Sequence, residues 1–289
     1  MQAPARPRRS VLYLPASNPK AIAKARTLAA DVVILDLEDA VAPEAKEMAR
    51  DAAVAAVREG GWGRREVVVR ANALDTPWGA EDLAAIASAS PDGVLVPKVS
   101  SAADIAAANA ALAEADPQTQ LWVMIETCAA LLQLDQIAAC AATTRLSAFA
   151  LGTNDLAKEM RARHVPGRAP FLPILSQTLI AARAHGLLAF DGVCNEFSDM
   201  AVVTAEARQG LEFGFDGKCL IHPGQVDPCN AVFTPGADEV AWAKAVVDAF
   251  ALPENQGKGA IRVEGKMAEL LHLEQAHRLL AIAEMIAAG

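Results

Sequence analysis

The chain has 289 residues, 53% of them hydrophobic and only 4% aromatic, and its formal net charge is −9. This acidic balance, with few aromatic rings to stack on bases, disfavours nucleic acids and anionic membranes as partners. No apolar run approaches the roughly 20 residues that a membrane span needs. The N-terminal MQAPARPRRS has arginines but no apolar signal core behind them. The cysteines form no CxxC pair, which indicates reduced thiols. We therefore expect a cytoplasmic globular protein.

Short apolar runs of strand length alternate with Ala-rich helical segments. The runs begin near Val11, Val32, Val67, Val94, Leu121, Leu146, Leu187 and Lys218. Helical segments such as 19–30 and 102–115 lie between them. This alternation predicts parallel βαβ units, and runs rich in Val, Leu and Ile are typical of strands covered on both faces. Such units close most naturally into an α/β (β/α)8 TIM barrel, with a doubly wound open sheet as the competitor.

Beyond the last predicted strand the chain continues with two further helical segments. An amphipathic helix is predicted over 238–250 and another over 267–286, whose leucines share one face. The segment 251–266 between them contains Gly257, Gly259 and Gly265, a composition that suggests a mobile linker or lid. We therefore predict a TIM-barrel catalytic domain over 1–235 and C-terminal helices with a lid over 236–289.

Most predicted strands end in a charged or metal-capable side chain, which predicts a single active site above the barrel. Glu126 ends the fifth run and Asp155 lies just after the sixth, in GTNDL. Neighbouring strands would bring these carboxylates together, and Mg2+ is typically held by one or two carboxylates with waters and substrate oxygens. The structural alternative is that Asp155 caps a helix and Glu126 pairs with a basic side chain.

An arginine ends the third run, in VVVRAN. There Arg70 can clamp a carboxylate or stabilise a developing oxyanion. Its structural alternative is to neutralise the acidic cluster of LDLEDAV, which contains Asp36, Glu38 and Asp39.

Two further side chains give weaker signals. Lys98, after VLVP, faces either the same site or solvent. His222 precedes a proline, and a histidine in that position can simply hold a turn.

The ordered motifs of the chain resemble those of a known family. They are RRSVLYLPASNPKAIAKA, VVILDLEDAV, VVVRAN, LVPKV, IET, LGTNDL, DGVCNEF and GFDGKCLIHPGQV. In this order they are similar to the citrate lyase β-subunit-like branch of the HpcH/HpaI aldolase superfamily, over about residues 8 to 286. The resemblance implies a TIM barrel, dependence on Mg2+, and cleavage or formation of a carbon–carbon bond beside a thioester.

The resemblance also implies roles for individual residues. Glu126 and Asp155 would bind the metal, and Arg70 would contact the acyl group and stabilise the thioester enolate of a retro-Claisen step. Glu38 and Asp39 resemble an acidic pair near the metal that could orient metal-bound water or Arg70.

Positions around the first strand resemble contacts to the phosphates of coenzyme A (CoA). These are Arg9, Asn18 and Lys20, the last two at the start of a helix. Glu196 stands in DGVCNEF where the family frequently has aspartate, which leaves the inherited role of that position open.

Glu269, in EGKMAELLHLEQA, matches an acidic residue that reaches the active site of a neighbouring subunit in related enzymes. An acid there would serve as a general acid–base. The alternative is an exposed helix glutamate paired with Lys266 or His272. A lid that acts in this way implies a homo-oligomer, a trimer or hexamer.

The resemblance as a whole implies a Mg2+-dependent CoA-ester lyase. Its substrate would be a 3-hydroxyacyl-CoA such as malyl-CoA or citramalyl-CoA, with CoA as part of the substrate. Hydrolysis of a malyl-type thioester is the nearest alternative, followed by the β subunit of a citrate lyase complex. A non-catalytic CoA-ester sensor is disfavoured, because a binding module needs no metal and arginine at the acyl carbonyl.

Overall fold

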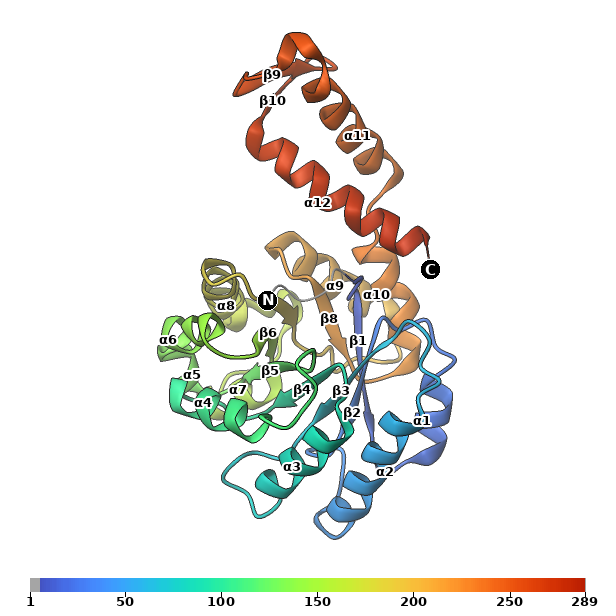
Figure 1. Cartoon of the computed structure of the whole chain (residues 1–289), viewed down its shortest axis with the longest axis vertical. Coiled ribbons are helices and arrows are strands. Elements are labelled where there is room, and N and C mark those ends of the chain that lie inside the picture. Colours follow the sequence, from blue (N-terminus) through green and yellow to red (C-terminus); the bar gives the residue numbers. More distant parts are fainter. Residues whose placement is uncertain (1–5, 289) are drawn as a thin grey trace. The chain divides into compact units, whose positions relative to one another are not determined.

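The predicted apolar runs form parallel strands in the computed structural model, which describes residues 6–288. Strands β1 to β8 pair in sequence order and β8 pairs with β1, so the sheet closes into a barrel (Figure 1). The strands are β1 Ser10–Pro15, β2 Val32–Asp36, β3 Glu66–Arg70, β4 Gly93–Val96, β5 Gln120–Ile125, β6 Leu146–Leu151, β7 Leu188–Asp191 and β8 Gly217–Leu220. The TIM-barrel prediction is confirmed, and the open doubly wound sheet is excluded.

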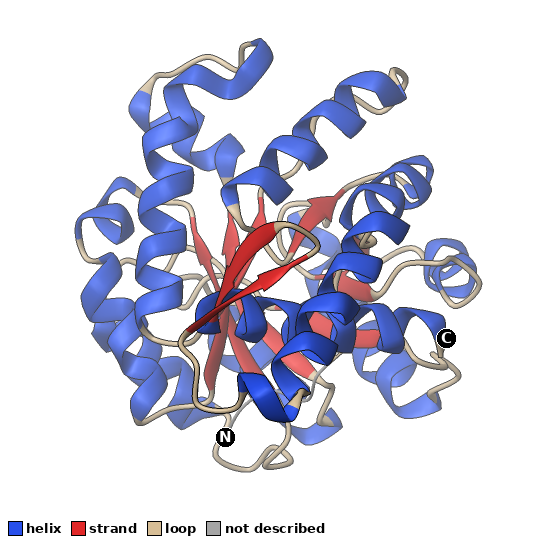
Figure 2. Cartoon of the chain, turned by 90° about the horizontal axis from the view of Figure 1, so that it is seen from above, coloured by secondary structure: helices blue, strands red, loops and turns tan. Residues whose placement is uncertain are grey.

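Helices connect successive strands and surround them, as Figure 2 shows in blue around red. They are α1 Pro19–Ala25, α2 Lys46–Glu59, α3 Gly79–Ala89, α4 Ala102–Ala111, α5 Cys128–Leu132, α6 Leu134–Ala139, α7 Thr153–Met160, α8 Leu172–Ala184, α9 Met200–Phe213 and α10 Val226–Phe233. None of the helices within residues 6–288 combines the length and the apolarity that crossing a membrane requires.

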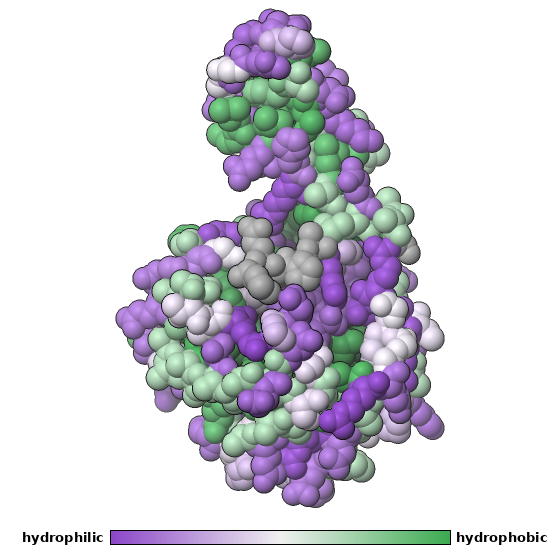
Figure 3. Space-filling view, in the orientation of Figure 1, coloured by the Kyte–Doolittle hydropathy of each residue, from purple (hydrophilic) through white to green (hydrophobic). Residues whose placement is uncertain are grey.

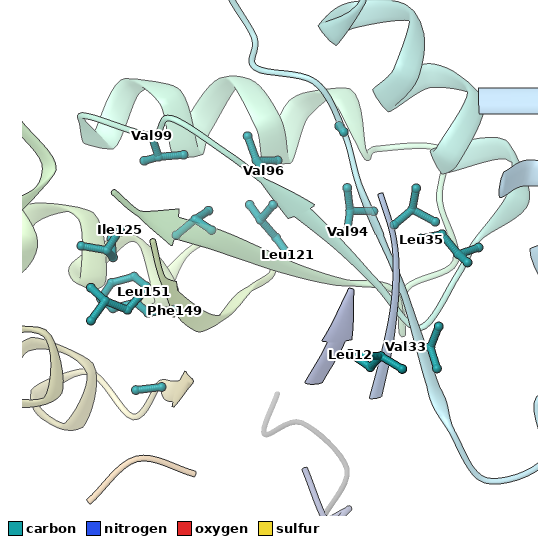
Figure 4. Packing of buried hydrophobic residues seen from close by; sticks show 14 of the residues in the cluster. Leu12, Val33, Leu35, Val94, Val96, Val99, Leu121, Ile125, Phe149 and Leu151 are labelled. Carbon is teal, nitrogen blue, oxygen red and sulfur yellow. The ribbon is translucent and has the colours of Figure 1, made fainter. Parts of the chain in front are cut away.

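The barrel strands bury both of their faces. Alternate side chains of a strand point to opposite sides of the sheet, so one set packs outward under the helices. Figure 4 shows part of this outer layer, including Leu12, Val33, Leu35, Val94 and Phe149. The other set fills the barrel interior and comprises Val11, Val32, Ile34, Val68, Leu95, Trp122, Met124, Ala148, Ala150, Phe190 and Cys219. Because the interior is packed, polar chemistry is confined to the ends of the barrel.

The chain divides into two compact units, one over Arg8–Phe233 and a second from Thr234 onward. The second unit contains α11 Ala237–Ala251, β9 Ala260–Val263, β10 Lys266–Glu269 and α12 Leu270–Ala287. Its own apolar core consists of Ala243, Val246, Ile261, Val263, Ala268 and Ala276.

The β9–β10 hairpin begins inside the segment 251–266, which the sequence predicts as a mobile linker or lid. Val263 pairs with Lys266, so the turn consists of Glu264 and Gly265, whose φ angles are 47° and 84°. Positive φ at both central residues matches the right-handed twist of a two-residue hairpin. The glycine was therefore a turn signal, and the last helix begins at Leu270 rather than at Met267.

Candidate active site

A polar layer continues the inward face of the strands at the carboxyl end of the barrel. Side chains on one face of a strand recur at every second residue. The inward positions that follow the apolar core are Tyr13 on β1, Asp36 at the end of β2, Arg70 at the end of β3, Glu126 directly after β5 and Gly152 directly after β6. The strand geometry therefore brings these positions to one end of the barrel.

Arg70 is buried and is held by a carboxylate of the neighbouring strand. Its Nε and Nη2 donate to Asp36 Oδ1 and Oδ2 at 2.6 and 2.7 Å. The remaining nitrogen, Nη1, lies 2.6 Å from Glu38 Oε2 and 3.4 Å from Asp39 Oδ2. The guanidinium carbon lies 5.1 Å from the centroid of the Tyr13 ring. The fork to Asp36 fixes the guanidinium plane, and Nη1 contacts Glu38 and Asp39, so Arg70 neutralises the acidic cluster. Its contact with the acyl group of a substrate stays a prediction.

One guanidinium serves three carboxylates in this cluster. Burial raises the pKa of Glu38 to about 8, although Arg70 opposes the shift. Asp36 accepts the two hydrogen bonds of the guanidinium fork, whereas the burial of Glu38 favours its neutral, protonated form. The two acids predicted near the metal thus differ, because Glu38 is buried whereas Asp39 is exposed.

The predicted metal ligands Glu126 and Asp155 converge on Lys98. Lys98 Nζ lies 2.7 Å from Asp155 Oδ2 and 3.4 Å from Glu126 Oε1. The Lys98 main-chain N–H also donates to Glu126 Oε1 at 2.7 Å. Lys98 therefore faces the site rather than solvent. Asp155 lies in the first turn of α7 and does not cap it, because the capping position belongs to Gly152.

The environment of Glu126 fits a cation. The residue is fully buried, and within residues 6–288 its Oε2 finds no hydrogen-bond partner. Burial raises its pKa to about 7. A Cβ on Gly152 would lie 2.5 Å from Glu126 Oε2, so only glycine leaves room for this carboxylate. No third His, Cys, Asp or Glu of the described chain completes a cluster with the pair, and two carboxylates suffice for Mg2+ when waters and substrate supply the other oxygens.

The residues predicted to bind CoA phosphates lie at opposite ends of the barrel. Arg9 precedes β1, and its Nε and Nη2 pair with Asp31 at 2.8 Å at the amino end of the strands. Arg9 therefore lies at the other end of the strands from the polar layer, and its predicted contact with the CoA phosphates stays a prediction. Asn18 and Lys20 follow β1 at the carboxyl end, where Asn18 Oδ1 caps α1 by accepting the N–H of Lys20 at 3.1 Å.

The remaining predicted residues have local roles. His222 Nδ1 accepts the N–H of Gly224 at 3.1 Å, so it holds a turn. Glu196 Oε1 accepts the N–H of Ser198 at 2.6 Å, which fixes the loop after β7. Glu269 is exposed and belongs to the C-terminal unit. It directly precedes α12, and its main-chain N–H donates to His272 Nδ1 at 2.9 Å.

The loops after β6, β7 and β8 are joined by amides that sequence reasoning missed. Asn154 and Asn195 exchange side-chain hydrogen bonds of 3.0 and 2.8 Å. Buried Gln225 donates to the Cys194 and Glu196 carbonyls at 3.0 and 2.8 Å. Neutral amides carry no sequence signal of their own, yet these ones fix the loop next to Asp155.

A second ion cluster lies at β7 and β8. Arg168 Nη1 donates to Asp191 Oδ1 and Oδ2 at 2.7 and 2.8 Å. Fully buried Lys218 donates to Asp191 Oδ2 at 3.0 Å and to the Gly192 carbonyl at 2.6 Å. This cluster ties the end of β7 to the start of β8 on the outward face of the sheet.

A TIM barrel with a buried arginine and a converging pair of carboxylates at the carboxyl ends of its strands defines an enzyme that stabilises negative charge on a bound substrate. The chain belongs to the HpcH/HpaI aldolase/citrate lyase family, whose model matches residues 9–223. This result confirms the family resemblance and identifies the protein as an enzyme of a carbon–carbon lyase family.

Individual relatives cover nearly the whole chain. A (3S)-malyl-CoA thioesterase of Cereibacter sphaeroides is 45% identical over 98% of this chain and 97% of its own. An L-malyl-CoA/beta-methylmalyl-CoA lyase of the same species is 35% identical over 99% of this chain and 97% of its own. The solved structure of CitE from Mycobacterium tuberculosis, in complex with magnesium, acetoacetate and coenzyme A, is 32% identical and has a TM-score of 0.77. That comparison covers 97% of this chain and 99% of CitE.

Proposed function

We propose that this protein is a Mg2+-dependent enzyme that hydrolyses the thioester of a malyl-CoA-type 3-hydroxyacyl-CoA. The observation that carries the proposal is the convergence of Glu126 and Asp155 on one point at the end of the barrel that presents Arg70. Sequence analysis ranked carbon–carbon cleavage first. The greater identity to the thioesterase, 45% against 35% for the lyase, favours hydrolysis.

The side chains divide the chemistry between them. Mg2+, when bound, supplies Lewis-acid polarisation of substrate oxygens. Glu126 and Asp155 would hold it. Arg70, oriented by Asp36, would donate Nη1 to the thioester oxygen and stabilise the negative charge that develops there. Glu38 in its ionised form would take the proton of the attacking water and pass it to the departing CoA sulfur, because a carboxyl with a pKa of about 8 is partly ionised near neutral pH.

Retro-Claisen cleavage to acetyl-CoA and glyoxylate is the second candidate function. It is favoured by the lyase relative and uses the same groups, with Arg70 stabilising the thioester enolate. The citrate lyase β-subunit role differs in requiring an acyl-carrier partner. In each case Asn18 and Lys20 would face the CoA phosphates at the carboxyl end of β1.

We propose that Glu269 completes the site of a neighbouring subunit in a homo-oligomer, a trimer or hexamer. Met267, Leu270 and Leu271 are exposed beside it, and Figure 3 shows apolar residues (green) on the surface of this unit. Exposed apolar side chains around one acid suit a surface that packs on another protein. If so, mixing inactive Glu269→Gln with inactive Arg70→Ala subunits restores part of the turnover. Full activity of Glu269→Gln alone would contradict this role.

One assay separates the candidate functions. The purified protein is incubated with Mg2+ and malyl-CoA, and free thiol, glyoxylate and acetyl-CoA are followed together. Hydrolysis releases thiol without glyoxylate, whereas cleavage releases glyoxylate and acetyl-CoA without thiol. Binding of malyl-CoA without any product would contradict both and leave a CoA-ester sensor. Turnover that requires an added acyl-carrier protein would indicate the citrate lyase role.

A further inference from the structure

Lys98 contacts both proposed metal ligands, Glu126 and Asp155, from an unusual backbone conformation. Its backbone has φ = 55°, a left-handed conformation that residues with a side chain rarely adopt. This conformation turns both the main-chain N–H and the ammonium group toward Glu126 Oε1, at 2.7 and 3.4 Å. The ammonium also lies 2.7 Å from Asp155 Oδ2. Backbone strain of this kind persists where the surrounding structure requires it.

The ammonium supplies the counter-charge that the carboxylates need. Glu126 is fully buried, and a buried carboxylate without a partner is strongly disfavoured. In the described chain Lys98 is the cation that both Glu126 and Asp155 contact. The ligands of the proposed metal are therefore held in place by a cation of the protein's own.

A metal ion held by Glu126 and Asp155 would share these two carboxylates with the ammonium, which contacts Glu126 Oε1 and Asp155 Oδ2. Mg2+ coordinates oxygens at about 2.0–2.1 Å, so an ion between Glu126 and Asp155 would lie a few ångströms from Lys98 Nζ. Two cations at such a distance repel each other strongly in a partly buried site. The Lys98 ammonium nitrogen is itself buried, but 31% of the side chain is exposed, so the ammonium can leave the carboxylates only if the side chain rotates outward.

We propose that Lys98 is an internal counter-cation that assembles the metal ligands before Mg2+ arrives and competes with the ion for Glu126 and Asp155. Metal binding then displaces the ammonium from Asp155. The inference rests on the metal site of the proposed function. It makes Lys98 a positioning residue that lowers Mg2+ affinity, whereas a purely structural clamp would raise it. Removing the Lys98 charge would therefore raise the affinity for Mg2+ if the ammonium competes with the ion, and lower it if Lys98 is only a structural clamp.

The test is calorimetric titration of Mg2+ into the metal-free protein without substrate. Lys98→Met removes the charge at similar length, and Lys98→Arg keeps it. We expect Lys98→Met to bind Mg2+ about tenfold more tightly than wild type, or better, since a difference of only about 1.4 kcal/mol gives that factor. Lys98→Arg should stay near wild type. The metal-free Lys98→Met protein should also melt at a lower temperature, because its ligands repel each other.

The outcomes separate this inference from the proposed function. Equal or weaker Mg2+ binding by Lys98→Met overturns the competition while the metal site stands. If neither wild type nor Lys98→Met binds Mg2+, the metal site itself fails, and the inference with it. Binding by Lys98→Met alone supports the competition. Should Lys98→Met fail to fold, Lys98→Gly removes the same charge without a penalty at φ = 55°.

Discussion

Two buried ion clusters lie on opposite faces of the barrel sheet, one in the inward polar layer at the carboxyl end and one on the outward face of β7 and β8. They differ in how completely their buried carboxylates are paired. At β7 and β8, both oxygens of Asp191 accept hydrogen bonds from Arg168, and Lys218 adds another. At β3 to β6, Glu126 Oε2 has no partner within residues 6–288. The same residue types thus form a framework in which both oxygens of the central carboxylate Asp191 are hydrogen-bonded, and a candidate binding site in which one oxygen of the fully buried Glu126 is left open. The pairing, rather than the burial, distinguishes the two.

The largest difference should appear when each cluster loses its carboxylate charge. Glu126→Gln removes a metal ligand at nearly constant volume, and turnover should fall by about 10²–10³-fold or more, as when a charge-stabilising group is lost. Calorimetry should show weaker Mg2+ binding, while circular dichroism shows an intact fold. Near-normal turnover, or wild-type activity that persists in EDTA, would remove Glu126 from the metal site.

The corresponding change in the other cluster should affect stability. Asp191→Ala leaves Arg168 and Lys218 buried without their carboxylate, and breaking such a pair costs about 3–5 kcal/mol of unfolding free energy. Urea denaturation measures this loss. The folded fraction should bind Mg2+ as tightly as wild type. If Asp191→Ala is stable but inactive, the β7–β8 cluster is part of the active site rather than the framework.

A methyl group tests how finely the open carboxylate is placed. In Gly152→Ala the new Cβ would lie 2.5 Å from Glu126 Oε2, so the carboxylate must move. Mg2+ affinity should fall by about 10–100-fold, as for residues that orient metal ligands. Gly259→Ala is the matched control because nothing lies within 4 Å of its added Cβ. Unchanged affinity in Gly152→Ala would show that Glu126 tolerates displacement.

The last prediction concerns pH and the metal-free protein. Burial raises the pKa of Glu38 from 4.5 to about 8 in the folded protein. Between these values the folded state binds a proton that the unfolded state does not, so the free energy of unfolding falls as pH rises through this range. Urea denaturation of metal-free wild type should show the decline, and Glu38→Gln should flatten it. Parallel curves for the two proteins would place the pKa of Glu38 near its ordinary value.

The sequence predicted the order of the elements better than the direction of single side chains. Strand ends located Arg70, Glu126 and Asp155, because parallel strands of a barrel share one carboxyl edge. Val32 and Ile34 face the barrel interior, so the two-residue alternation also predicts that Asp36 faces inward. This position is missed when the strand is read as one continuous apolar run.

Other features could not be predicted, for physical reasons. The direction of Lys98 depends on a left-handed backbone that its residue type does not favour. Glycine occurs both in tight hairpin turns and in flexible linkers, so the composition of the segment could not distinguish the two. The ion pair of Arg9 with Asp31 at the amino end of the strands also could not be predicted, because the two residues are far apart in the sequence.

The pairing of Asp36 with Arg70 ties the chemistry of this enzyme to its folding. The two residues are ladder partners on β2 and β3, which are separated by a crossover connection. Their hydrogen bonds therefore form only when these two strands pair in the correct register. A slip of one residue would turn Arg70 toward the surrounding helices. Misaligned barrels would lack the guanidinium at the site, so catalytic activity acts as a direct reporter of correctly aligned strands.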